Sequence, residues 1–357
     1  MSRNSFRTSL LTAAALAVAV PLSAQTPERV TLTGAQVAIW DIAGTVSLTP
    51  ASGRAVTVAV TRRGRDAGQL QLAQGTIRGR ETLRVIFPGD QVVYPTDSRM
   101  RSRWSSDLRV RDDGTFGGDN YRGRDDGRRV RVTSSGSGTE AAADLEIGVP
   151  AGQELAIYLA VGSVTARNID GKILLDTHAA GVTATGMKGD LDIDTGSGDV
   201  SVNGMVGPLR VDVGSGSVDL ADVSGGDLDV DAGSGDVRGT GVTSTALNID
   251  TGSGDVELAG LVAQDVKVDV GSGDVTLAWT GDPGDVDIDS GSGEVRLTMP
   301  AASGATVDLE SSSGDINSDF PISTTRIERD ALRGSFGDGR GRIVVETGSG
   351  DVSILKR

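Results

Sequence analysis

Short segments of alternating apolar and polar residues recur along the second half of the chain. Leu191 and Ile193 alternate with aspartates, and the same arrangement returns at Leu209 and Val211. After each glycine-rich turn a second apolar pair follows, beginning for example at Val200. A period of two places successive side chains on opposite faces, so each segment is predicted to be a strand buried on one face. The glycines and the β-branched residues exclude a helix.

The turns between these segments repeat about every nineteen residues. Copies of GSGDV or close variants of it begin at Gly196, Gly214, Gly233, Gly252, Gly271, Gly291, Ser312 and Gly348. The last interval is 36 residues, close to two periods. One unit cannot bury its apolar face alone, whereas stacked units form a continuous narrow core. We therefore predict an all-β fold, a parallel β-helix (β-solenoid) with coils of about 19 residues; a propeller or sandwich is the alternative, but 19 residues are too few for a four-stranded blade.

Carboxylates occupy two positions around the turns, two residues before the first glycine and three residues after it, with Ser217 as the only departure. In stacked coils each set becomes a column of like charges at the strand spacing of about 5 Å. The aspartates could accept backbone N–H bonds and hold the turns. Alternatively they bind a divalent cation, for which Ca²⁺ is the natural choice, although no cofactor is required. The candidate metal ligands are Asp194, Asp199, Asp212, Asp231, Asp236, Asp250, Asp255, Asp269, Asp274 and Asp289.

The start of the chain has the pattern of a secretory signal peptide. Arg3 and Arg7 precede an apolar run that ends at small residues, and we expect cleavage after Ala24. The protein is thus predicted to be exported, with no transmembrane segment after cleavage. We expect residues 25–144 to form an N-terminal β region and residues 145–357 the repeat domain. The segment from Phe320 to Arg342 departs from the repeat and is expected to cover the far end of the stack.

An Arg/Gly/Asp-rich stretch at about residues 95–131 interrupts the strand pattern of the N-terminal region. Ten arginines and seven aspartates lie between residues 94 and 131, together with four aromatic residues. Such a composition is typical of a solvated loop. It would also suit a binding loop, in which guanidinium groups and aromatic faces contact an anionic glycan or a protein. The candidate ligand-binding residues are Arg99, Arg101, Arg103, Trp104, Tyr121 and Arg122.

Composition and charge exclude several classes of function. The chain has no cysteine and a single histidine, which excludes disulfides, thiolate sites and multi-histidine metal centres. Residues 136–357 carry 37 acidic against 14 basic residues, so this part repels phosphate backbones and no nucleic-acid partner is expected. Carboxylate pairs are abundant, but repetition gives no single pair a distinct environment, and catalysis is not expected.

The stacked GSGDV and SSGDI turns, with the closing segment from Gly348 to Val352, resemble a bacterial adhesin-like family of unknown function related to head GIN domains. The resemblance implies a β-helical, exported or envelope-associated protein with an adhesive or scaffolding role, and it implies no catalytic residues. We predict a non-catalytic adhesin-like or envelope-scaffold protein that is periplasmic, outer-envelope or secreted. Its expected partner is a cell-envelope component, either a glycan or a protein. The alternatives are a Ca²⁺-dependent binding module and, less favoured, a polysaccharide-active β-helix enzyme.

Overall fold

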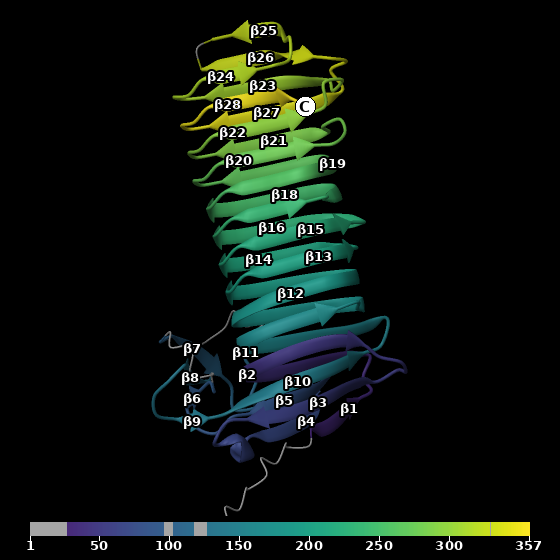
Figure 1. Cartoon of the computed structure of the whole chain (residues 1–357), viewed down its shortest axis with the longest axis vertical. Coiled ribbons are helices and arrows are strands. Elements are labelled where there is room, and N and C mark those ends of the chain that lie inside the picture. The colour runs from purple at the N-terminus through teal and green to yellow at the C-terminus, as the bar shows by residue number, and fades with distance from the viewer. Residues whose placement is uncertain (1–26, 96–102, 118–126, 329) are drawn as a thin grey trace, which may run out of the picture.

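The computed structural model describes residues 27–95, 103–117, 127–328 and 330–357, and nearly all regular structure in these ranges is β. Within them, 24 strands form one sheet that winds into a solenoid, and four form a smaller second sheet (Figure 1). In the same ranges one 3₁₀ turn, η1 (Ala67–Gln69), interrupts the strands. In the described part of the chain no helix is long and apolar enough to span a membrane. The predicted signal peptide, residues 1–24, lies outside the described residues.

The predicted solenoid is confirmed, and its period follows from the strand pairing. Ile193 pairs in parallel with Val211, and Val211 pairs with Val230, so each coil stacks on the equivalent residues of the next coil. Two strand segments joined by a glycine-rich turn make up one coil. The strands of the regular part are β11 (Gln153–Arg167), β12 (Asp170–Ser197), β13 (Val200–Val206), β14 (Leu209–Ser215), β15 (Val218–Ser224), β16 (Gly226–Ser234), β17 (Val237–Thr240), β18 (Thr243–Ser253), β19 (Val256–Val270), β20 (Val275–Trp279), β21 (Asp285–Ser290) and β22 (Val295–Met299).

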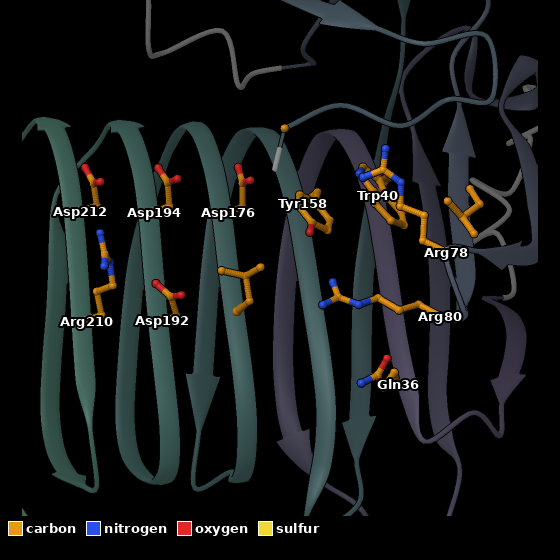
Figure 2. A pocket seen from close by; sticks show the side chains of 13 residues that line it. Gln36, Trp40, Arg78, Arg80, Tyr158, Asp176, Asp192, Asp194, Arg210 and Asp212 are labelled. Carbon is orange, nitrogen blue, oxygen red and sulfur yellow. The ribbon is translucent and has the colours of Figure 1, made fainter. Parts of the chain in front are cut away.

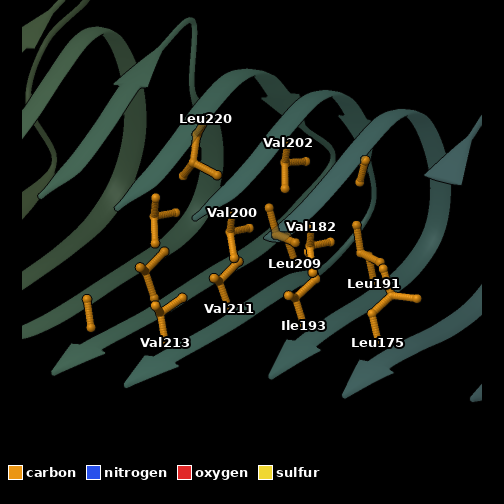
Figure 3. Close-up of a cluster of buried hydrophobic side chains, with 14 of the residues drawn as sticks. Leu175, Val182, Leu191, Ile193, Val200, Val202, Leu209, Val211, Val213 and Leu220 are labelled. Carbon is orange, nitrogen blue, oxygen red and sulfur yellow. The ribbon is translucent and has the colours of Figure 1, made fainter. Parts of the chain in front are cut away.

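The core is a thin column of aliphatic side chains enclosed by the coils. Inward-facing residues of successive coils, such as Leu191 and Leu209, are buried and lie next to one another along the rod (Figure 3). The facing segment contributes Val200 and Val202 in the same manner. Each fully buried aliphatic side chain stabilises the fold by about 1.5–3 kcal/mol. Because every coil supplies the same few residues, stability is distributed along the rod.

The second glycine of each GSGD turn is required by two separate constraints. Gly235 has a φ of +137° and Gly254 has a φ of +141°, which is backbone that other residues rarely adopt. In addition, a Cβ atom at Gly235 would overlap the carbonyl oxygen of Gly216 in the preceding coil. The turns therefore depend on glycine both for conformation and for the close approach of neighbouring coils.

The N-terminal strands complete and cover one end of the solenoid. Strand β2 (Gln36–Pro50) stacks in parallel on β11 and thereby forms a coil of its own. Strand β10 (Ala142–Val149) continues this end, pairing in parallel with β2 and antiparallel with β3. The boundary predicted between residues 144 and 145 falls inside β10. The remaining strands here are β1 (Glu28–Leu32), β3 (Val56–Arg63), β4 (Gln71–Ile77) and β5 (Arg80–Ile86).

The structure corrects the loop predicted at about residues 95–131. Strand β7 (Ser105–Val110) lies within that range and pairs antiparallel with β8 (Arg128–Thr133). Leu108 and Val130 are among the buried apolar side chains of these two strands. These side chains pack the strand pair against the core, although many of the surrounding residues are charged. Strands β6 (Gln91–Val93) and β9 (Thr139–Glu140) complete this second sheet, which lies beside the N-terminal end of the rod (Figure 1).

At the C-terminal end the order of the coils differs from their order in the sequence. The final repeat, β27 (Gly341–Thr347) and β28 (Val352–Lys356), is inserted between the coil of β21 and β22 and the coil of β23 (Ala305–Ser311) and β24 (Ile316–Ser318). In Figure 1 these yellow strands lie between green ones. Strand β26 (Ala331–Phe336) then pairs antiparallel with β23, and β25 (Ser323–Ile327) pairs with β26. The segment that departs from the repeat thus covers this end.

Candidate functional site

The first column of carboxylates, here named the strand ladder, follows one outward-facing position from coil to coil. Strand pairing places its members in direct register. Partial burial, together with the neighbouring carboxylate of Asp212, raises the pKa of Asp231. The pKa of Asp250 is raised in the same way, by partial burial and by Asp269 and Asp231. In spatial order the strand ladder consists of Asp194, Asp212, Asp231, Asp250, Asp269, Asp289, Glu346 and Glu310.

The second column, here named the turn ladder, lies just after the GSG corner and bonds one coil to the next. Asp236 Oδ1 accepts the backbone N–H of Asp255 at 3.0 Å, and Asp255 Oδ1 accepts that of Asp274 at the same distance. The N–H of Asp255, followed by the guanidinium of Arg238, lowers the pKa of Asp236. In the same way, Oδ1 of an aspartate accepts a backbone N–H in three further places: Asp199 from Ser217, Asp274 from Glu294, and Asp351 from Asp315.

The two ladders therefore differ in what their carboxylates do. Each bonded aspartate of the turn ladder, including the candidate metal ligands Asp199, Asp236, Asp255 and Asp274, uses one oxygen to hold a turn. Members of the strand ladder project from the outer face instead. Among the described residues, no three or more histidine or carboxylate side chains converge on one point suited to a metal ion.

Towards the N-terminus the strand ladder column changes from carboxylates to aromatic rings. Asp176 pairs in register with Tyr158, and Tyr158 pairs with Trp40 (Figure 2). The two rings stack in parallel with centroids 4.5 Å apart and planes inclined by 3°. Trp40 Nε1 donates a hydrogen bond of 2.9 Å to the carbonyl oxygen of Phe116. One column of the solenoid thus ends in an aromatic pair that is held from the side by a loop of the N-terminal region.

Beside this aromatic pair the surface is hollowed into two adjoining cavities of about 400 and about 450 Å³. Both are lined by Arg80, Leu174, Asp192 and Arg210, so they form one continuous depression. We name it the cross-strand groove, because it crosses the strands from β2 to β16 instead of following one of them. Its lining also includes Gln36, Trp40, Arg78, Ala156, Tyr158, Asp176, Asp194, Asp212 and Asp229 (Figure 2).

The groove exists because one outward-facing row contains small or apolar residues where neighbouring coils carry charges. Ala38 pairs with Ala156, and Ala156 pairs with Leu174. The next members of that row are Asp192 and Arg210, which are exposed. The floor is consequently apolar on the N-terminal side and charged on the C-terminal side.

Arginines from several elements surround the floor. Arg80, at the start of β5, lies 3.8 Å from a carboxylate oxygen of Glu154, and Arg210 lies 3.7 Å from one of Asp229. Arg78 occupies the β4–β5 turn with a φ of +52°, a conformation that glycine or asparagine adopts at lower cost. Gln36 Nε2 donates to Glu154 Oε2 at 2.9 Å. The groove therefore presents positively charged hydrogen-bond donors and negatively charged acceptors around a floor that is apolar on its N-terminal side.

Of the predicted ligand-binding residues, Arg99, Arg101, Tyr121 and Arg122 lie outside the described residues. The other two, Arg103 and Trp104, come directly before β7. Trp104 packs at a tilt against the ring of Tyr94, with centroids 6.2 Å apart. The guanidinium of Arg63 lies 5.7 Å from the centre of the same Tyr94 ring. The exposed Arg103 is thus anchored next to a packed aromatic cluster, away from the lining of the cross-strand groove.

Sequence reasoning missed Trp40, Tyr158, Arg78 and Arg80, which lie in segments where the repeat is weak or absent. The available signal was limited to the spacing of 18 residues that joins Tyr158 to Asp176 and Asp176 to Asp194. Nothing in the sequence connected Trp40 to that column.

A match to a protein-family model supports the fold assignment. The family model described as Toastrack DUF4097 matches residues 117–355. A crystal structure of a "putative cell adhesion protein" from Clostridium sporogenes is similar over 93% of this chain and 100% of that chain, with 10% identity and a TM-score of 0.22. No curated protein matches the sequence.

Proposed function

The chain belongs to the Toastrack DUF4097 family, and we propose that it is an exported, non-catalytic, adhesin-like protein that binds a component of the cell envelope. Its solenoid acts as a rigid support, and its binding site is the cross-strand groove. The observation that carries this proposal is the groove itself, in which donors and acceptors from strands far apart in the chain line one depression. Concave surfaces with an apolar floor and a few convergent polar groups are the usual form of a binding site.

The arrangement of the carboxylates favours binding over catalysis. Hydrolysis by paired carboxylates needs two groups whose environments push their pKa values apart. In the groove Asp176, Asp194 and Asp212 occupy equivalent positions of one column, on the same face of the sheet. A column of this kind offers repeated contacts for an extended ligand.

Binding to envelope material tests this proposal directly. The chain from residue 25 onward would be labelled and titrated against envelope fractions of the bacterium that makes it. We expect saturable binding, with no release of small products from the bound material. Heat-denatured protein is the control. Failure of the native chain to bind any envelope fraction would refute the proposal, and product release that follows enzyme kinetics would replace it with the polysaccharide-active alternative.

The predicted arginine-rich contact extends the same proposal to the second sheet. Arg103 is exposed next to the Trp104–Tyr94 pair, and a second contact there would increase avidity for a large envelope ligand. The variant Arg103→Ala should then weaken binding to envelope fractions without altering the melting temperature. Unchanged affinity would confine the interaction to the groove.

A second candidate function, a Ca²⁺-dependent binding module, is favoured by the raised pKa values of Asp231 and Asp250 in the strand ladder. Carboxylates that repel one another gain from a bound cation. Melting curves at low salt, with Ca²⁺ and with chelator, test it. A rise of several degrees with Ca²⁺, lost in Asp231→Asn/Asp250→Asn, is expected for cation binding by linkage. Identical curves would eliminate this candidate.

A further inference from the structure

We infer that the cross-strand groove binds an uncharged carbohydrate chain that lies along the solenoid axis. The apolar face of its sugar rings would pack on Ala156 and Leu174, and its hydroxyl groups would bond to Arg80, Asp192 and Arg210. The inference rests on the proposed binding function and specifies its ligand class. Four observations carry it: the direction of the groove, the spacing of its polar groups, the excess of carboxylates in its lining and the backbone of Arg78.

The direction of the groove argues against a peptide that joins the sheet. A peptide bound by strand addition needs a free strand edge with unpaired backbone groups. Here the groove runs across strands that are hydrogen-bonded on both sides, from β2 through β11 and β12 to β14 and β16. Antiparallel strands cover the ends of the stack. Only side chains are therefore available to a ligand in the groove.

The spacing of those side chains suits a polymer with hydroxyl groups on every unit. Asp192, Arg210 and Asp229 follow one another in a single row, so an acceptor, a donor and an acceptor lie at successive strand spacings of about 4.8 Å. Sugar hydroxyls both donate and accept, and can match such an alternation. From β2 to β16 the floor extends for roughly 24 Å, which accommodates several sugar units. The apolar surface of Leu174 lies in the same row, where it can contact ring C–H groups.

The charges of the groove select against an anionic ligand. Carboxylates outnumber cationic groups in its lining: the cations are Arg78, Arg80, Lys172 and Arg210, and the carboxylates are Glu154, Asp176, Asp190, Asp192, Asp194, Asp212, Asp227 and Asp229. A polyanion would be repelled by this excess of negative charge. An uncharged chain uses both kinds of group as hydrogen-bond partners, and hydrogen bonds to charged groups are the stronger ones.

Arg78 supplies a further, independent sign of a functional position. Its backbone lies in the left-handed region, in a turn whose other central residue is Gly79. Left-handed backbone at a residue other than glycine or asparagine costs free energy, and such strain gathers at functional sites. The turn places this guanidinium on the rim of the groove next to the Trp40–Tyr158 pair (Figure 2).

Calorimetric titration of the chain from residue 25 onward tests the inference with three defined probes. These are chitohexaose and cellohexaose, which are uncharged, and a hexamer of galacturonic acid, which is anionic. We expect binding of at least one uncharged hexasaccharide and a weaker interaction with the anionic one. Preference for the anionic hexamer, or binding of none of the three, would overturn the inference.

Groove variants with matched controls locate the bound chain. Asp192→Asn and Arg80→Ala should weaken hexasaccharide binding at least tenfold. Leu174→Glu should do the same by charging the floor, and the coil should tolerate it because Asp192, 18 residues further along the chain, lines the same groove. The controls are Asp219→Asn and Arg238→Ala, exposed residues of β15 and β17 outside the groove.

The outcomes separate this inference from the broader proposal. Equal affinities for groove and control variants, with melting temperatures unchanged, would overturn the inference. If groove variants bind envelope fractions as well as the unaltered chain does, the carbohydrate groove is excluded while an adhesin-like role elsewhere on the rod survives. If the groove variants, but not the control variants, lose binding to the hexasaccharide and to envelope fractions, the result would support the inference and the proposed function together.

Discussion

Trp40 and Tyr158 stack with their ring planes within 3° of parallel, although they lie far apart in the chain and belong to different parts of the sequence pattern. They are neighbours because β2 pairs with β11 in parallel, as one regular coil pairs with the next. The aromatic pair therefore forms the N-terminal end of the carboxylate column and one wall of the cross-strand groove.

Replacing Trp40 should reveal how strongly this end of the rod depends on the pair. The variant Trp40→Ala should lower the free energy of unfolding by about 3–5 kcal/mol, because a large buried side chain leaves a cavity. Trp40→Phe keeps the stacking surface and loses mainly the hydrogen bond to Phe116, so it should cost about 1 kcal/mol. Urea denaturation measures both. Equal losses in the two variants would show that the stack contributes little.

The turn glycines should be intolerant of even a single methyl group. Gly235→Ala forces a left-handed residue and an overlap with the carbonyl of Gly216, so a clear drop in melting temperature is expected. Gly281→Ala is the matched control, since a Cβ atom there meets open space. Thermal melts followed by circular dichroism compare the two. A similar melting temperature for both variants would contradict the assigned role of the turn.

The turn ladder should contribute through its acceptor oxygen more than through its charge. Asp255→Ala removes the acceptor for the N–H of Asp274 and should cost about 0.5–1.5 kcal/mol. Asp255→Asn retains an acceptor oxygen and should recover most of that loss. Hydrogen exchange of the Asp274 amide, measured by NMR, gives the local readout. Faster exchange in both variants alike would show that the negative charge itself is required.

A buried carboxyl group at the N-terminal end should make stability depend on pH. Asp41 is 1% exposed, and burial, reinforced by Asp144, raises its pKa well above the usual range. The folded state therefore holds the proton more tightly than the unfolded chain does. The stabilisation that comes from protonated Asp41 is complete below the pKa of the unfolded chain, about 3.9. It is lost as the pH rises through the higher pKa of Asp41 in the folded protein.

The variant Asp41→Asn should remove this dependence. Relative to the unaltered protein, its melting temperature should rise progressively from pH 4 to neutral pH, because asparagine stays uncharged in the core. Asp112→Asn, at an exposed position, serves as the control and should leave the melting temperature unchanged. A constant difference between Asp41→Asn and the unaltered protein across this range would show that Asp41 does not titrate as argued.

The sequence by itself determined the regular part of the protein. The period of about nineteen residues, the alternation of residues such as Leu191 and Ile193, and the glycines of each turn are local features, and each predicts its own strand or corner. Because every coil repeats them, stacking follows from burial of the shared apolar face. The two carboxylate columns also followed from the period, and the bonding of Asp255 to Asp274 is one of the two roles that aspartate near a turn was expected to have.

Only the tertiary structure decided how the ends of the rod are built. A repeated coil can pair equally well with any similar coil, so the pattern alone does not show that the repeat of Gly348 inserts between two earlier ones. The pattern also does not show that β2 pairs with β11 and that β5 pairs with β2. These pairings place Trp40, Arg78 and Arg80 at the groove. These contacts join segments that lack the repeat, and they are selected by which strand edges and apolar surfaces the regular coils leave to be covered.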